Sequence, residues 1–527
     1  MGLPATLSVP TTEAHAEQPE PVGDPDLRLL VDGQVLLPVS VDQGLHIFHL
    51  IGPARQIRLL SRALVPAAQG QGSPDDRRLG VSLWWIRLRG SDASIELRHD
   101  YRGLEEGFHQ AEAGARWTDG FALLPSRVHR FLTGAVTVEV MIGCPDVQYP
   151  VPAYTPRPRA LVIDATVPTP DRDAGSNVIL EHMRLLQSLG YAITFLPANL
   201  DAPSPYAEAL AEAGIELVAH PFTAGLEHLI ALRGPSFALA YVHRVTVAEQ
   251  AMPLLRRYAP QARILFNNAD LHFLRLQREA ELTGSAALAQ EAEDMRGREL
   301  RAFAEADAAL VCNSQEMDLL ADELPDARMV YLPWVIGPRG RSAAGFAERH
   351  GIMFLGGFAH RPNADAVIWF VTTVMPLLRP LLPGVVLHVY GHGMPEAVRA
   401  LAGPDVAIEG SIAELAEAFA RHRVSIAPLR FGAGFKGKLA ESLAHGVPVV
   451  ASSVAVEGSG LIGDEHLLVA DGAGPFALAV VRLYQTPALW QQLAEEGNRF
   501  ALAAFSERLG RQRLSEALAL AGLAAAD

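Results

Sequence analysis

A glycine-rich segment with two lysines is the part of the sequence whose residue types and spacing point most directly to chemistry. It runs from Leu429 to Gly446 and reads LRFGAGFKGKLAESLAHG. The segment follows a buried-strand pattern and opens a helix-length run, so its glycines would expose backbone N–H groups at a helix N-terminus, where anions bind. Lys436 and Lys438 add positive charge. The segment therefore predicts a diphosphate cradle; the alternative is a glycine-rich turn with solvated lysines.

Two nucleotide-binding motifs overlap in this segment, and neither is complete. Gly432, Gly434 and Gly437 spell G-x-G-x-x-G, the dinucleotide fingerprint, and Gly437-Lys438 completes most of a P-loop. The P-loop fails at Leu439, which has no hydroxyl for Mg²⁺. The dinucleotide fingerprint belongs after the first strand of a βαβ unit, whereas this segment follows the fourth strand of its series. A dinucleotide-dependent enzyme, a P-loop-type enzyme and a non-catalytic glycan-binding protein are three interpretations that stay open.

The stretch GAGFKGKLAESLAHGVPVVAS (432–452) resembles the donor-site segment of retaining GT-B glycosyltransferases, in particular family four. The family pattern Glu-Ala-(Met/Leu)-Ala-x-Gly-x-Pro-Val-Val-Ala is matched at Glu441, Gly446 and 448–451. Residues 160–197 also resemble the first βα unit of that family, so the resemblance spans about 158–510. It implies an enzyme, hexosyltransferase in type, that moves a sugar from a nucleotide-diphosphate sugar to an acceptor hydroxyl with retention, in polysaccharide or glycan assembly.

The resemblance also implies roles for single residues. Lys436 would neutralise the departing diphosphate as a catalytic residue, helped by the loop amides. Glu441 would accept hydrogen bonds from the two ribose hydroxyls, which suits a carboxylate. The predicted donor-binding residues on this segment are Gly432, Gly434, Phe435, Lys436, Lys438 and Glu441.

The sequence departs from the family pattern at two places. The family's Glu-x₇-Glu pair has Ala433 at its first position, so the donor sugar cannot be read from the sequence. The family's Gly-Arg-Leu-x-x-x-Lys phosphate motif corresponds to 356–358 and Pro362, so both of its cations are lost. We expect Lys436, Lys438 or Arg361 to compensate, because a subgroup of the family shares the Gly-x-Gly-x-Lys-x-Lys arrangement seen here.

Further candidates lie where predicted strands end, because strand ends of an α/β lobe face the cleft. His243 and Asp270 are candidate catalytic residues that would contact the sugar or the acceptor hydroxyl; for His243 a packing or capping role is the alternative. His360 precedes a predicted helix and is a candidate phosphate contact. On the acceptor side the candidates are Asp173, in an Asp-Arg-Asp triplet, and Gly175. A D-x-D triplet binds a metal in another glycosyltransferase fold, but its place here, in the loop after the first strand, suits acceptor contacts. No other His/Asp cluster has ligand spacing, so we expect no essential metal. We also expect no cofactor, because the nucleotide-sugar that the resemblance implies is the substrate.

Composition bounds the class of protein. The 527 residues are 49% hydrophobic and 20% charged, which excludes a disordered or fibrous chain. A net charge of −15 argues against a nucleic-acid partner. Cys144 and Cys312 suggest neither a disulfide framework nor a metal site, and no secretory signal or membrane-length apolar run is evident. We therefore expect a cytoplasmic enzyme, with room for peripheral contact at the inner face of the membrane if its glycan acceptor is lipid-linked.

The pattern of elements along the chain predicts an α/β protein, and the family resemblance implies that its fold is of GT-B type. Near-continuous apolar strands alternate with helices in two series, which predicts two doubly wound, Rossmann-like lobes with a cleft between them, preceded by a β-sandwich-like domain. The predicted divisions are a disordered tail at 1–26, a β-rich accessory domain at 27–148, a Pro-rich linker at 149–158, an acceptor lobe at 159–340 and a donor lobe at 341–527, whose last helix is expected to cross back. In the β-rich domain Trp117 lies in a segment resembling accessory modules of glycan-processing proteins, where it would stack on a sugar or, alternatively, pack in the core.

Overall fold

The computed structural model describes residues 23–32, 34–69, 73–91, 93–143, 147–149, 158–172, 174–203, 205–220, 223–337, 344–411 and 415–523. The chain divides into two compact units, Met1–Arg157 and Pro158–Asp527. The division falls inside the stretch predicted as a Pro-rich linker. The predictions made for Cys144, for Asp173, for the tail up to residue 22 and for most of the linker lie outside the described residues.

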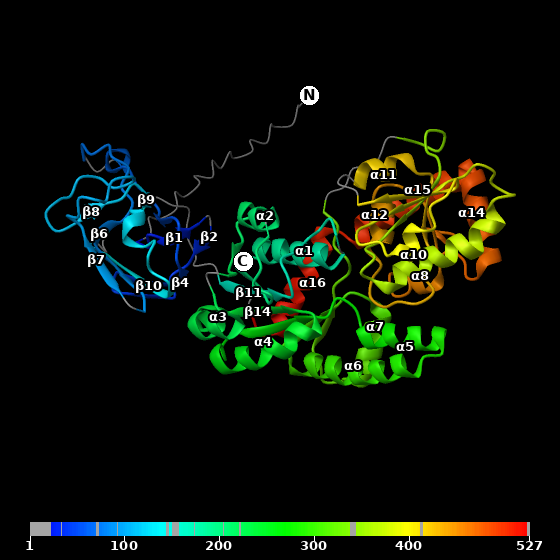
Figure 1. Ribbon diagram of the computed structural model, residues 1–527, viewed down its shortest axis with the longest axis horizontal. Coiled ribbons are helices and arrows are strands. Elements are labelled where there is room, and N and C mark those ends of the chain that lie inside the picture. Colours follow the sequence, from blue (N-terminus) through cyan, green and yellow to red (C-terminus); the bar gives the residue numbers. More distant parts are fainter. Residues whose placement is uncertain are drawn as a thin grey trace, which may run out of the picture. The chain divides into compact units, whose positions relative to one another are not determined.

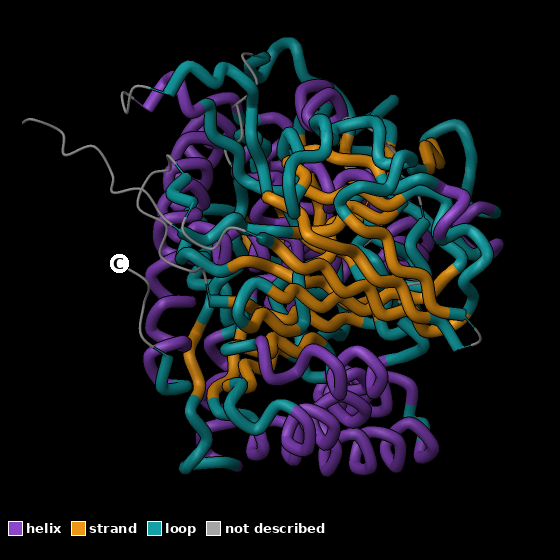
Figure 2. The backbone as a smooth tube through the Cα atoms, turned by 90° about the vertical axis from the view of Figure 1, so that its left-hand side faces the viewer, coloured by secondary structure: helices purple, strands orange, loops and turns teal. Residues whose placement is uncertain are grey.

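The first unit is built from antiparallel strands, as predicted for the β-rich region. One sheet has the order β2-β1-β5-β9 and the other β3-β4-β10-β6-β7, with β8 paired to β6. Buried and partly buried residues alternate along β4, so one face of its sheet packs inward. Trp117 packs against Leu64, Leu79 and Tyr149, which favours its core role over sugar stacking. Figure 2 shows the adjacent strands of this unit in orange.

The elements of the first unit have the following bounds: β1 (Arg28–Val31), β2 (Gln34–Leu36), β3 (Ser40–Asp42), β4 (Leu45–Gly52), β5 (Ile57–Leu60), η1 (Pro66–Gln69), β6 (Ser82–Arg89), β7 (Ser94–Arg98), β8 (Arg116–Trp117), β9 (Phe121–Leu123), η2 (Ser126–Val128) and β10 (Gly134–Ile142).

The second unit begins with the lobe predicted to be the acceptor lobe, and we keep the labels acceptor lobe and donor lobe from here on. The seven strands of the acceptor lobe are all parallel. Their order is β13-β12-β11-β14-β15-β16-β17. Such strands are covered by helices, which is why they are apolar nearly throughout. The elements are β11 (Arg159–Asp164), α1 (Ala174–Ser188), β12 (Ala192–Pro197), α2 (Tyr206–Glu212), β13 (Glu216–Leu217), α3 (Leu226–Arg233), η3 (Gly234–Ser236), β14 (Leu239–His243), α4 (Val245–Tyr258), β15 (Arg263–Asn267), α5 (His272–Thr283), α6 (Ala286–Glu305), β16 (Ala308–Val311), α7 (Ser314–Glu323) and β17 (Met329–Tyr331).

The donor lobe repeats this plan with six parallel strands in the order β20-β19-β18-β21-β22-β23. The strand order reverses between β18 and β21, and ligands of such sheets bind at this switch point. Its elements are β18 (Ile352–Leu355), α8 (Arg361–Trp369), η4 (Phe370–Val374), α9 (Met375–Leu378), β19 (Leu387–Tyr390), α10 (Glu396–Arg399), β20 (Val406–Gly410), α11 (Leu415–Arg421), β21 (Val424–Ala427), α12 (Gly437–Ala444), β22 (Val449–Ala451), α13 (Ser453–Val456), β23 (Leu468–Val469), α14 (Ala473–Gln485), α15 (Pro487–Ala504) and α16 (Glu507–Leu520).

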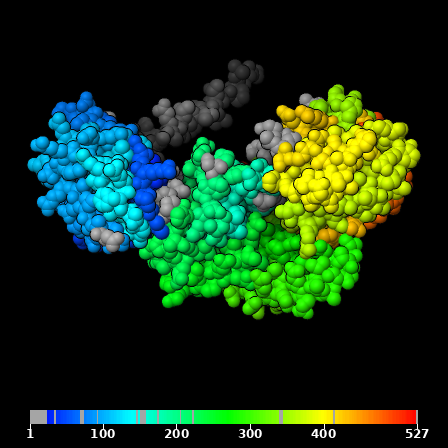
Figure 3. All heavy atoms as spheres, viewed as in Figure 1, coloured from blue at the N-terminus to red at the C-terminus, as the bar shows by residue number. Residues whose placement is uncertain are grey.

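The last helix, α16, returns to the acceptor lobe. Leu514, Ala517 and Leu518 of α16 are buried in the core of that lobe, together with residues of α1 and β17. In Figure 1 the red α16 lies beside the green α1, and in Figure 3 atoms of the two lobes touch. The two lobes of the second unit are thus tied together by the chain itself and by direct contact. Within the described ranges, every helix is too short or too polar to cross a membrane.

Candidate functional site

A cavity of about 430 Å³ opens at the carboxyl ends of β18, β19 and β21, which is the switch point of the donor lobe. Both lobes form its wall. The donor lobe contributes, among others, Gly357, His360, Gly432, Phe435, Lys436, Lys438 and Glu441. The acceptor lobe contributes Pro170, Asp171, Arg172, Asn177, Arg275 and Trp334. The predicted donor segment therefore faces a cavity between the lobes of the second unit.

The wall of this cavity is positively charged, although the chain as a whole carries a net charge of −15. Among the residues that line it, four are cationic and two are carboxylates: Arg172, Arg275, Lys436 and Lys438 against Asp171 and Glu441. A local excess of cations in a partly enclosed site focuses positive potential. The cavity is therefore suited to an anionic ligand.

Lys436 ends the glycine-rich loop and precedes α12. Its side chain is buried, with Lys436 only 9% exposed, and its Nζ donates hydrogen bonds to the carbonyl oxygens of Ala433 at 3.0 Å and Gly434 at 2.6 Å. Burial lowers the pKa of Lys436, and the carboxylates of Glu316 and Asp270 oppose that shift. The ammonium is therefore fixed in the loop, next to the position predicted for a diphosphate.

Lys438 and Glu441 stand on α12, three residues apart, and both face the cavity. The Nζ of Lys438 donates a hydrogen bond to Asn363 Oδ1 and lies 4.4 Å from the centre of the Phe354 ring. Burial, with a smaller contribution from the charge of Lys436, lowers the pKa of Lys438 to about 7. Glu441 keeps a partly accessible carboxylate whose Oε2 lies 3.9 Å from His445 Nδ1. The helix thus presents one cation and one hydrogen-bond acceptor to a ligand.

Three acceptor-lobe residues hold the glycine-rich loop in place. Arg278 donates to the Gly432 carbonyl oxygen at 2.7 Å and forms an ion pair with Glu457 at 2.6 Å. Asn313 Nδ2 donates to the carbonyl oxygens of Gly434 at 3.3 Å and Glu457 at 2.9 Å. The buried carboxyl of Glu316 accepts a hydrogen bond from the Gly434 N–H. These three residues could not be identified from the sequence, because they lie over 100 positions from the loop and match no motif.

The Gly434 amide is consequently not directed at the cavity as predicted. The Gly434 N–H donates its hydrogen bond to the Glu316 carboxyl, and Gly434 does not line the cavity. Burial raises the pKa of Glu316 to about 7, against the opposing effects of the Gly434 N–H and the charge of Lys436. Gly434 has a φ of +68°, and a Cβ on it would lie 2.6 Å from Asp270 Cβ. Glycine is therefore required here for close approach to the acceptor lobe.

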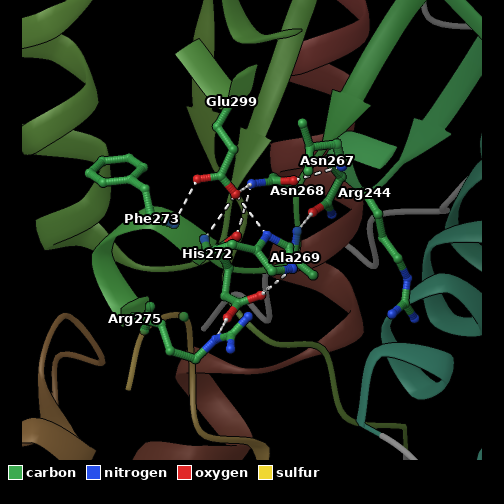
Figure 4. A network of polar contacts seen from close by, with 12 residues as sticks. Arg244, Asn267, Asn268, Ala269, His272, Phe273, Arg275 and Glu299 are labelled. Carbon is green, nitrogen blue, oxygen red and sulfur yellow. Dashed lines mark hydrogen bonds and ion pairs between the residues drawn. The ribbon is translucent and has the colours of Figure 1, made fainter. Parts of the chain in front are cut away.

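Asp270 belongs to a polar network at the end of β15, part of which Figure 4 shows. Its carboxylate accepts a hydrogen bond from Arg275 Nε at 3.2 Å and lies 3.7 Å from His272 Nε2. His272 Nδ1 is 2.7 Å from the fully buried Glu299, which also accepts from the Asn268 amide. Burial acts to raise the pKa of Asp270, but the charges of His272, Arg275 and His360 outweigh it and hold that pKa below its usual range. Asp270 is therefore an ionised carboxylate, but it is not among the residues that line the cavity, and its catalytic role stays a prediction.

The backbone next to this network is unusual at two strand ends. Arg244, after β14, has a φ of +74°, and Ala269, after β15, has a φ of +66°. Arg244 forms an ion pair with Asp164 at 2.9 Å, and Ala269 N donates to Asn267 Oδ1 at 2.7 Å. Left-handed conformations of such residues persist where surrounding contacts impose them, and they gather at functional sites.

The remaining predicted residues fall into two groups. His360 and Phe435 line the cavity, and the Phe435 ring stacks on Trp334 at 5.7 Å between centroids. Arg361 and Gly175 do not line it: Arg361 pairs with Glu279 at 2.9 Å, and Gly175 lies in the first turn of α1. The Arg361 side chain is thus engaged away from the cavity, which disfavours it as the compensating phosphate contact.

His243 is fully buried at the end of β14, where its ring stacks on Tyr241 at 6.4 Å between centroids. It is not among the residues that line the cavity. The end of a strand in an α/β lobe faces the cleft, but the His243 side chain points into the protein interior instead. The structure therefore favours the packing alternative for His243 over a catalytic contact.

Comparison with known proteins finds a family match within the donor lobe. Residues 349–486 match the family model of glycosyl transferases group 1. A search of curated proteins found no significant match. The match confirms the predicted glycosyltransferase function and places the glycine-rich loop, Lys436 and Glu441 inside the matched domain.

Solved structures confirm the predicted GT-B fold. Sucrose-phosphate synthase from Thermosynechococcus elongatus is similar with a TM-score of 0.54 and 16% identity, covering 68% of this chain and 98% of its own. Anabaena HepE in complex with UDP and glucose gives 0.52 and 13%, covering 68% and 99%. Trehalose 6-phosphate synthase from Burkholderia multivorans gives 0.51 and 12%, covering 69% and 97%. At these identities the likeness concerns the fold.

Proposed function

We propose that this protein transfers a hexosyl group, with retention of anomeric configuration, from a nucleotide-diphosphate sugar to an acceptor hydroxyl. The observation that carries the proposal is the cationic cavity at the switch point of a lobe that matches glycosyl transferases group 1. A nucleoside diphosphate is the anion of suitable size and charge for such a cavity. HepE, which shares the fold, was solved in complexes with UDP and with UDP-glucose, so uridine is the first base to test.

In the proposed reaction the bond between the anomeric carbon and a diphosphate oxygen breaks, and its electron pair stays on the diphosphate. The acceptor oxygen bonds to the anomeric carbon on the same face, and its proton passes to the departing diphosphate. Lys436 stabilises the charge that builds on this leaving group, in a partly enclosed site where such stabilisation is strong. Glu441 accepts hydrogen bonds from the ribose hydroxyls, and Lys438 contributes charge beside it.

We place the acceptor on the acceptor-lobe side of the cavity, near Asp171, Arg172 and Asn177. The Tyr206 hydroxyl donates to Asp171 at 2.8 Å, which fixes this rim. A glycan, free or lipid-linked, is the acceptor class that we propose. Transfer to a lipid-linked acceptor would bring a cytoplasmic enzyme to the inner face of the membrane, and Cys312, a free thiol, suits a reducing compartment. No group of residues suited to a metal ion occurs in the described ranges.

The dinucleotide alternative is disfavoured by topology. The G-x-G-x-x-G loop follows β21, whereas a dinucleotide fingerprint follows the first strand of its lobe, here β18. The third alternative, a glycan-binding protein without activity, predicts binding without turnover.

A panel of UDP- and GDP-hexoses, assayed with mixed oligosaccharide acceptors for released nucleoside diphosphate and for the new glycosidic bond, separates these functions. Release that requires an acceptor and yields an α-linked product from an α-linked donor supports retaining transfer. An inverted product would contradict retention, and absence of turnover with every donor, together with glycan binding, would contradict the enzyme.

A further inference from the structure

We infer that Arg275, on α5 of the acceptor lobe, is a further catalytic residue that contacts the departing diphosphate from across the cavity. The inference rests on the proposed function, because it assigns a residue to the leaving group of that reaction. Arg275 lies on α5, in the opposite lobe to the glycine-rich loop, and it belongs to none of the motifs found in the sequence.

The first support is the position of Arg275 on a helix that bridges the two lobes. Arg278, three residues further on, holds the Gly432 carbonyl oxygen at 2.7 Å and Glu457 at 2.6 Å. Glu279 pairs with Arg361 of the donor lobe at 2.9 Å. Residues three and four apart share a helix face, so the face that touches the donor lobe also carries Arg275. Arg275 itself lines the cavity that Lys436 and Lys438 line from the other side.

The second support is how the Arg275 side chain is held. Its Nε donates to Asp270 Oδ2 at 3.2 Å, and the side chain is 15% exposed. In the described part of the chain, Asp270 is the one acceptor of a hydrogen bond from Arg275. The two terminal nitrogens, with four N–H donors, are therefore left for a ligand. A guanidinium fixed at Nε in this way is pre-oriented to bind two phosphate oxygens at once.

The other cations of the cavity wall are engaged differently. Lys436 donates to the loop carbonyls of Ala433 and Gly434, and Lys438 donates to Asn363. The Arg172 guanidinium lies over the Tyr206 ring at 5.4 Å. In the described part of the chain, Arg275 differs from Arg172 in that its Nε is held by a carboxylate at hydrogen-bond distance, 3.2 Å from Asp270 Oδ2, whereas the Nε of Arg172 lies 4.0 Å from Asp171.

The carboxylate of Asp270, which orients Arg275, is also held by a second partner. Asp270 also faces His272, whose other ring nitrogen is held by the buried Glu299 (Figure 4). Asp270 is therefore held in position and can align the Arg275 side chain. Because Arg275 belongs to the acceptor lobe, its contact with a diphosphate bound to the donor lobe exists only while the lobes are together.

In the transfer step, Arg275 would act on the oxygens that gain charge as the anomeric carbon–oxygen bond breaks. Its contact strengthens as the electron pair moves onto the diphosphate, so the contact accelerates the step. It also favours binding of the diphosphate over the monophosphate of the same nucleoside. These two effects distinguish a leaving-group contact from a structural arginine.

The test uses the full-length chain with Arg275→Gln and Arg275→Lys, and with Arg298→Gln as the matched control. Arg298, on α6 of the acceptor lobe, pairs with Glu249 of α4 at 2.6 Å and does not line the cavity. Turnover is measured as nucleoside diphosphate release from saturating sugar donor. Affinities are measured for UDP and UMP, and for GDP and GMP, and thermal unfolding without ligand checks the fold.

We expect Arg275→Gln to lower kcat about 100-fold or more, as removal of one transition-state donor typically does. The preference for the diphosphate over the monophosphate should fall about tenfold, with monophosphate affinity unchanged. Arg275→Lys, which keeps the charge, should retain more turnover than Arg275→Gln, and Arg298→Gln should match the wild type.

An Arg275→Gln variant with wild-type kcat and wild-type diphosphate preference would overturn the inference while the proposed function stands. Equal losses of diphosphate and monophosphate affinity would also overturn it, because they indicate a structural role. A wild-type chain that binds neither UDP nor GDP refutes the proposed function itself, and the inference with it.

Discussion

Replacement of Gly434 by alanine tests whether the glycine-rich loop works while docked on the acceptor lobe. Gly434 has a φ of +68°, and an added Cβ would lie 2.6 Å from Asp270 Cβ and 3.2 Å from the Ala269 carbonyl oxygen. Gly384 in the same lobe offers a matched control, because it has a φ of +80° and no atom within 4 Å of an added Cβ. Gly384→Ala therefore carries the backbone strain of the substitution without the steric contact.

The magnitude follows from separating these two costs. Left-handed backbone costs alanine about 1–2 kcal/mol at either position. At Gly434 the contact adds the cost of overpacking, about 1–3 kcal/mol. Because the atoms that Cβ would strike belong to the acceptor lobe, separating the lobes relieves the contact. The extra cost therefore falls on lobe closure and corresponds to about a 5- to 150-fold smaller closed population.

The assay compares nucleoside diphosphate release by Gly434→Ala and Gly384→Ala at saturating sugar donor, together with their thermal unfolding midpoints. We expect similar midpoints and turnover that is about 5- to 150-fold lower in Gly434→Ala. Turnover within twofold of Gly384→Ala would show instead that the contact between Gly434 and Asp270 is absent from the active form.

Four further predictions concern the donor segment and the division of the chain. Lys436→Ala should lower kcat, because it removes about 2.7–4 kcal/mol of transition-state stabilisation, while the fold persists. Wild-type turnover would show that Lys436 does not take part in the reaction. Glu441→Gln should weaken UDP binding by about 1 kcal/mol but leave binding of 2′,3′-dideoxy-UDP unchanged, and equal losses for both nucleotides would exclude a ribose contact. UDP affinity should fall as pH rises through about 7, because the pKa of Lys438 is lowered to about 7 and the neutral amine no longer attracts the diphosphate. Lys438→Met should remove that part of the pH dependence, and an unchanged profile would assign it elsewhere. A chain that begins at Pro158, where the second compact unit starts, should stay in solution and bind UDP like the full chain; its aggregation would show that the β-rich unit covers apolar surface.

Local sequence pattern was sufficient for the elements that carry the donor segment. The buried run of β21, the glycines and the amphipathic run of α12 predict a strand, a tight loop and a helix, and the structure has all three. The alternation of apolar strands and helices likewise predicted two doubly wound lobes, and the family resemblance implied that they form a GT-B fold. These features depend on neighbours in the chain, so periodicity and turn chemistry reveal them.

The partners of the loop could not be predicted in the same way. Glu316, Asn313 and Arg278 reach it through the packing of one lobe on the other, and nothing in their own segments marks them. The burial of His243 has a similar cause: a strand end faces the cleft, but the side on which a side chain lies depends on the register of the sheet. Arg361, expected near the phosphates, is instead drawn to Glu279 across the lobes.

Calorimetric titration of the chain with UDP, GDP and NAD tests whether the cavity behind the glycine-rich loop binds a nucleoside diphosphate. We expect UDP or GDP to bind at one site per chain, NAD to give no heat of binding, and Lys436→Ala to weaken the binding of the nucleoside diphosphate. Binding of NAD in place of both diphosphates, or diphosphate binding that is unaffected by Lys436→Ala, would contradict this expectation.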